Sequence, residues 1–137
     1  MHNRGKRWHE RGNAMAETAV VLPVVLVLTF ALVNFAIAGY ASVAAANAAN
    51  YGARVGSVAQ QGAAGAAASA AHSALSRTMV GEYQVAASGG GRPGSQVTVA
   101  VHWEAPNFIG SMLSLLGGGG EVKFEGSARS TFRQEGW

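Results

Sequence analysis

The chain has no cysteine and no aspartate, and charged residues make up only 12% of its 137 residues. Without cysteine there can be no disulfide scaffold, thiolate metal site or cysteine nucleophile. No two of the four histidines have the spacing of zinc ligands. The glycine runs lack the lysine and hydroxyl residue that a phosphate-binding loop requires. We therefore expect no metal, no cofactor and no enzymatic activity.

The few charges are unevenly distributed along the chain. Residues 1–12 contain four basic side chains and one acid, which gives 4 − 1 = +3. The remaining residues contain six basic and six acidic side chains, which gives 6 − 6 = 0. A nucleic-acid interface needs cations clustered on a folded surface. We therefore expect no nucleic-acid partner, because the basic character belongs to the N-terminal segment alone.

Between Glu17 and Arg54 there is no charged residue. Residues 18–38 are almost entirely apolar, and as a helix they span about 30 Å, the thickness of a hydrocarbon core. A core helix of a soluble protein would show a polar stripe, which is lacking here. The run predicts a single membrane span in contact with lipid, and Pro23 predicts a kink within it. The basic flank places the N-terminus in the cytoplasm and the rest of the chain in the periplasm or outside the cell.

A secretory signal peptide is an alternative explanation of this segment. Signal peptides also begin with basic residues, and the small residues at 44–46 could serve as a cleavage site. Their apolar region is about 7–15 residues long, however, and this run is longer. It also begins with Glu17. A secreted binding protein released by signal peptidase is therefore a competing interpretation.

The stretch RGNAMAE, residues 11–17, carries the most specific signal. Taken alone, Glu17 could be a solvated acid favoured by the dipole at a helix start. The stretch nevertheless resembles the processing site of type IV prepilins. This resemblance implies that a prepilin peptidase cuts after Gly12, which makes Asn13 the new N-terminus and Glu17 the fifth residue. A buried carboxylate is tolerated when it is paired, so Glu17 could pair with the α-ammonium of a neighbouring subunit.

The longer stretch RGNAMAETAVVLPVVLVLTFALVNFA resembles the start of TadE-like proteins, the minor pilins or pseudopilins of the tight-adherence (Flp, type IVb pilus) system. The matching positions are Arg11, Gly12, Glu17, Leu22 and Pro23, whereas Thr18 stands where an aromatic residue often follows the glutamate. The resemblance implies a role in pilus assembly, adherence and biofilm formation. The partners that it implies are a prepilin peptidase, an Flp-type major pilin, another TadE- or TadF-like pseudopilin, the inner-membrane assembly platform and membrane lipid.

Alanine-rich sequence follows the apolar run and favours a continuing helix. Apolar residues recur at intervals of three and four from Tyr40 to Val58. Gly52 and Gly56 form a Gly-x3-Gly pair, which indicates either close packing in a filament or membrane bundle or simply the small residues of such a helix. Residues 66–79 predict a second helix or a continuation of the first.

Beyond Val80 the apolar residues alternate with a period of two, which is typical of strands. The predicted elements are strands over 83–87, 97–103 and 122–132, a turn over 88–95 and a short helix over 108–116 near the membrane surface. We therefore predict an α+β fold: a long transmembrane helix that continues outside the membrane, followed by a small antiparallel sheet with a short connecting helix. The expected parts are a leader (1–12), a transmembrane helix (13–40), an alanine-rich helical region (41–79) and a β-rich domain (80–137).

Two further interpretations remain beside the pilus component and the secreted protein. An unprocessed single-pass protein could present an exported binding domain. A membrane-anchored enzyme is the weakest interpretation, because the sequence shows no catalytic constellation. The sequence leaves open whether a pilus component would enter the filament, its tip or only its base.

Overall fold

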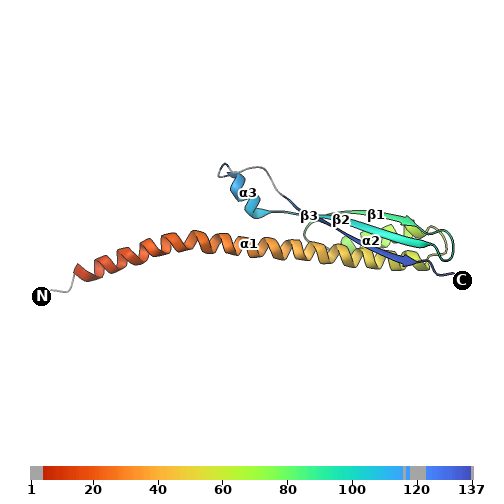
Figure 1. Ribbon diagram of the computed structural model, residues 1–137, viewed down its shortest axis with the longest axis horizontal. Helices are drawn as coiled ribbons and strands as arrows, with labels where there is room; N and C mark the ends of the chain where they lie inside the picture. The colour runs from red at the N-terminus through yellow and green to blue at the C-terminus, as the bar shows by residue number, and fades with distance from the viewer. Residues whose placement is uncertain (1–4, 116, 118–122, 137) are drawn as a thin grey trace.

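A computed structural model describes the backbone of residues 5–115, 117 and 123–136, and the side chains within these ranges except 5–14, 112, 113 and 115. The described elements follow the order α1 (Gly5–Val58), α2 (Ala63–Leu75), β1 (Glu82–Gly89), β2 (Gln96–Ala105), α3 (Phe108–Leu115) and β3 (Phe124–Arg133). The N-terminal part of α1 projects alone, α2 and the sheet lie along its C-terminal half, and α3 stands off near its middle (Figure 1). The α+β prediction is confirmed.

Helix α1 has 54 residues and is therefore about 80 Å long. It continues through Pro23 and curves gently along its length (Figure 1). Among the described residues it is the one helix long and apolar enough to cross a membrane. Only 6% of its most apolar window is buried within the protein. That low value distinguishes this segment from the core helix of a soluble protein.

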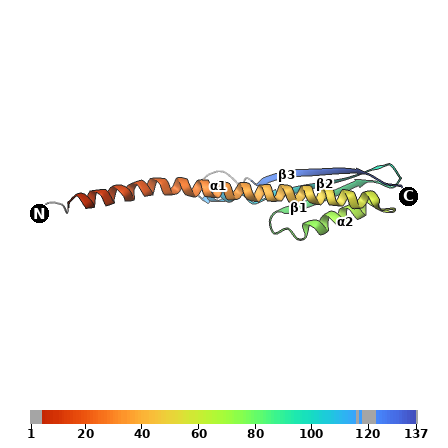
Figure 2. The same cartoon turned by 90° about the horizontal axis from the view of Figure 1, so that it is seen from below.

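Helix α2 packs back along the C-terminal half of α1 (Figure 2). Gly62, with φ of 62°, provides the left-handed backbone between the two helices. A Cβ at Gly52 would lie 2.6 Å from the Ala67 carbonyl oxygen, and one at Gly56 would lie 2.7 Å from Ala67 Cβ. The Gly-x3-Gly pair thus permits close packing of α2 on α1 within one chain. Neither interpretation of the pair from the sequence predicts this contact.

The three strands form one antiparallel sheet in the order β1-β2-β3. Val97, Val99 and Val101 of the central strand are fully buried and face the helices. Small side chains of α1 and α2 complete this core: Ala45, Ala48, Ala49, Ala53, Ala63, Ala67 and Ala71. The apolar face of the sheet therefore packs on the alanine-rich part of α1 and on α2.

The boundaries of two elements differ from the prediction. The second helix is separate from the first and runs from Ala63 to Leu75, not from 66 to 79. After Leu75 the chain turns away from the helix, because the Thr78 N–H and hydroxyl both donate to the Leu75 carbonyl, at 2.9 and 2.6 Å, and cap the last turn. The third strand begins at Phe124, and the part of the prediction that fell on Val122 lies outside the described residues.

Candidate functional site

The predicted processing segment lies in the first turns of α1. The backbone of Gly12 and Asn13 is helical, whereas their side chains are outside the described set. Glu17 lies one helical turn beyond Asn13, and its side chain is exposed. Within the part of the chain that the structure describes, no ion pair neutralises this carboxylate. A partner for Glu17 would therefore have to come from outside these residues.

The helix after Glu17 exposes large apolar side chains around its whole circumference. Ten large apolar side chains between Val20 and Val33 are 44–72% exposed, which water would disfavour and lipid would accept. The single polar side chain of this range is satisfied within the helix. The Thr29 hydroxyl donates to the Val25 carbonyl at 2.8 Å. Such pairing suits a low-dielectric surrounding, where an unpaired hydroxyl is costly.

Asn34 is the exception to this exposure, because it is 1% exposed. Its amide nitrogen donates to Asn107 Oδ1 at 2.9 Å, and its Oδ1 accepts the Phe108 N–H at 3.1 Å. Asn107 Oδ1 also accepts the Gly110 N–H at 3.0 Å, which makes Asn107 the N-cap of α3. The sequence shows Asn34 only as an interruption of an apolar run, and a partner 73 residues away could not be read from it.

The family model described as TadE-like protein matches residues 12–54. Residues 12–54 are therefore TadE-like in sequence. The matched range begins at Gly12, contains Glu17 and Pro23, and ends four residues before the end of α1. The sheet and the helices α2 and α3 lie outside the matched range. Comparisons with curated proteins and with solved structures give no match.

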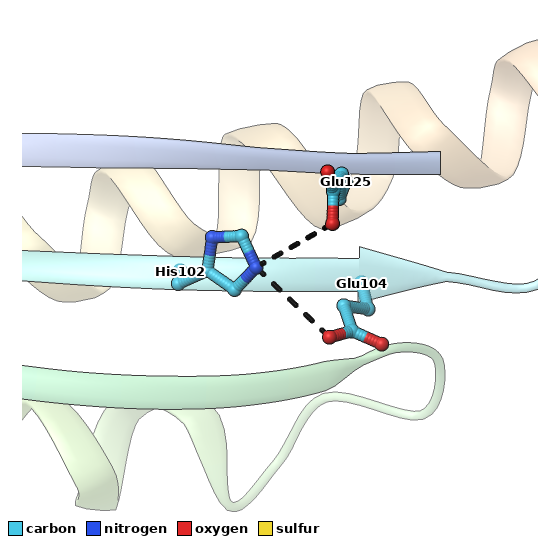
Figure 3. Close-up of side chains that lie close together, drawn as sticks. All are labelled: His102, Glu104 and Glu125. Carbon is cyan, nitrogen blue, oxygen red and sulfur yellow. Dashed lines mark ion pairs between the residues drawn. The ribbon is translucent and has the colours of Figure 1, made fainter. Parts of the chain in front are cut away.

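A group of titratable side chains lies on the outer face of the sheet, away from the helices (Figure 3). His102 Nε2 is 4.0 Å from Glu104 Oε1 and 4.0 Å from Glu125 Oε2. The three potential ligand atoms lie within 4.8 Å of one another. Zinc–ligand distances of about 2.0–2.2 Å limit two ligand atoms to about 4.4 Å apart. The side chains would therefore have to close in before they could hold a metal.

Charge pairing accounts for this cluster without a metal. Glu104 and Glu125 are direct partners in the β2–β3 register, and like charges at such positions destabilise a sheet. Lys123 Nζ donates to Glu104 Oε2 at 3.1 Å and offsets this repulsion. This group could not be predicted from the sequence, because its members come from two strands. The alternation of His102 and Glu104 on β2 was visible, but the register that brings Glu125 opposite was not.

Proposed function

We propose that this chain is a TadE-like minor pilin or pseudopilin that takes part in assembly of a tight-adherence, Flp-type pilus, and that a prepilin peptidase processes it after Gly12. The observation that carries the proposal is the family match beginning at Gly12, on a helix whose next turns present Glu17 and then an exposed apolar surface. A helix with this surface is suited to a bilayer before assembly and to neighbouring helices afterwards. The proposed role is structural and not enzymatic.

In the proposed orientation the N-terminus is cytoplasmic and the sheet domain lies in the periplasm or beyond. Cleavage after Gly12 removes the net +3 of residues 1–12 and creates an α-ammonium at Asn13. The exposed Glu17 carboxylate then pairs with the ammonium of a neighbouring subunit, an Flp-type major pilin or another pseudopilin. Such a pair fixes the axial register of the two helices, because a charge buried among apolar helices is tolerated only when it is paired.

The packing of α1 weighs against release by signal peptidase. Cleavage within residues 44–46 would separate Ala41 and the N-terminal part of α1 from the remaining domain. Ala41 and Ala45 are both 0% exposed, and Ala45 belongs to the core that supports the sheet. A cut there would divide a continuous helix in the middle of its packed length. The membrane-anchored form keeps this core intact.

Substitutions at the processing segment test the proposal in cells that form the pilus. Gly12→Ala should leave the leader attached, and Glu17→Gln should remove the charge needed for pairing while conserving shape. Both variants should reach the membrane yet fail to support pili and surface adherence. Glu82→Gln is the matched control, because Glu82 is an exposed acid at the start of β1. Normal piliation with Gly12→Ala and Glu17→Gln would instead favour an unprocessed protein with an exported binding domain.

A further inference from the structure

Helix α3 begins at the level of the apolar part of α1. The hydrogen bonds from Asn34 to Asn107 and to the Phe108 N–H fix that level. Figure 1 shows α3 standing off α1 on the side of the projecting half, beyond the end of the sheet. Its sequence, FIGSMLSL, has no charged residue, and the Phe108 side chain is 45% exposed. An apolar helix therefore projects from the folded domain next to the proposed membrane span.

The position of a bilayer along α1 can be worked out from the helix rise. A hydrocarbon core of about 30 Å takes roughly 20 helical residues. Counted from Glu17, the far boundary falls near Ile37, so Asn34 lies about 5 Å inside it. Tyr40, 49% exposed, lies just beyond the boundary, where aromatic side chains are enriched. The hydrogen bonds of Asn34 thus place the start of α3 slightly below the surface of the hydrocarbon layer.

The charged end of the sheet limits how deeply α3 can enter the bilayer. Glu104, near the end of β2, forms an ion pair with Lys123. Glu104 lies three residues before Asn107, so at most about 10 Å of chain separates the two. These charges require headgroups or water. Only a narrow layer remains for α3, at the boundary between headgroups and acyl chains. Interfacial helices typically bury their apolar face about 5–10 Å into that boundary.

We propose that α3 is a second membrane contact, which lies on the outer surface of the bilayer and is held there by Asn34 and Asn107. The proposal rests on the membrane anchoring in the proposed function and adds a surface that the family match does not include. It gives the buried Asn34 a purpose, because an unpaired amide this deep would be costly. With two contacts, α1 and α3, the domain keeps a fixed rotation and height above the membrane.

A single spin label tests the contact in the full chain, because the sequence contains no other cysteine. Phe108→Cys is labelled in vesicles of phosphatidylcholine and phosphatidylglycerol, and its collisions with oxygen are compared with those of a water-soluble nickel complex. Leu28→Cys reports the middle of the span, and Ser88→Cys reports an exposed position at the distal end of β1. We expect the oxygen-to-nickel ratio at Phe108 to lie between the two controls and several-fold above that at Ser88.

The controls separate failure of this inference from failure of the anchoring. A water-like ratio at Phe108 with a lipid-like ratio at Leu28 would overturn the contact by α3 alone. A water-like ratio at Leu28 would overturn both proposals.

A second comparison tests the role of Asn34 in holding α3. Asn34→Leu should increase the mobility of the Phe108 label and leave the Leu28 ratio unchanged. Asn47→Leu, at an exposed asparagine of the same helix, should change neither value. Equal label mobility in the Asn34→Leu variant and the parent would overturn the proposed docking.

Discussion

The close approach of α1 and α2 makes Gly56→Ala a decisive substitution. A Cβ at Gly56 would lie 2.7 Å from Ala67 Cβ, 2.8 Å from the Ala63 carbonyl oxygen and 2.9 Å from Val97 Cγ1. Two of these atoms belong to a short side chain or to backbone and cannot swing away. Overpacking of this kind costs typically about 1–3 kcal/mol, whereas replacing glycine in a helix returns about 0.5–1 kcal/mol. The expected net loss of stability lies between about 0 and 2.5 kcal/mol and is centred on about 1 kcal/mol.

Gly65→Ala is the matched control for this substitution. Gly65 lies within α2, and a Cβ there would meet nothing within 4 Å. Only the helix-propensity term applies, so this variant should be more stable than the parent by about 0.5–1 kcal/mol. The two glycine-to-alanine changes, nine residues apart in sequence, should therefore shift stability in opposite directions.

Thermal unfolding of the full chain in detergent, followed by near-ultraviolet circular dichroism, measures both effects. One kcal/mol shifts the Tm of a domain of this size by about 4–8 °C, so the signs are readily separated. If Gly56→Ala raised the Tm as Gly65→Ala does, the packing of α2 on α1 would be refuted. If Gly56→Ala left the Tm unchanged but abolished pili, the glycine pair would instead contact neighbouring subunits.

Two further predictions concern the folded domain. Gln134→Ala should lower the free energy of unfolding by about 2–3 kcal/mol, as measured by chemical denaturation. The reason is that the buried Gln134 amide donates to the Ala59 carbonyl and accepts from the Gly91 N–H, each at 2.8 Å. As a control, Gln61→Ala at an exposed position should change this free energy by less than about 0.5 kcal/mol. Burial raises the pKa of Tyr83 above 10.0. The folded state therefore holds the phenolic proton of Tyr83 more tightly than the unfolded state does. The stability that this provides is fully present below pH 10 and is lost as the pH rises through the raised pKa. Tyr83→Phe should flatten the alkaline part of the stability profile, and an unchanged profile would contradict the assignment.

Most of the fold follows from local patterns in the sequence. The long apolar run gives α1, the alanine-rich segment gives its continuation, and strict alternation from Val97 to Trp103 gives β2. These features are strong because each depends on the nearest residues along the chain. The ends of α2 were less accurate, since they depend on a left-handed Gly62 and on the closing hydrogen bonds after Leu75.

Contacts between distant residues could not be predicted in the same way. The pairing of Asn34 with Asn107 and that of Glu104 with Glu125 depend on tertiary packing and on strand register. The glycine pair at Gly52 and Gly56 can be recognised in the sequence, but the helix that packs on it, α2, cannot. The processing residues differ from all of these. Their role depends on a peptidase and on neighbouring subunits, so the cleavage after Gly12 and the pairing of Glu17 stay predictions.

The mass of the N-terminal peptide of the mature protein tests the proposed function most directly. The protein is isolated from the membranes of pilus-forming cells and digested, and its N-terminal peptide is identified by mass spectrometry. The account predicts a chain that begins at Asn13, and a Gly12→Ala variant that retains residues 1–12. A chain from those cells that still begins at Met1, with pili present, would contradict it.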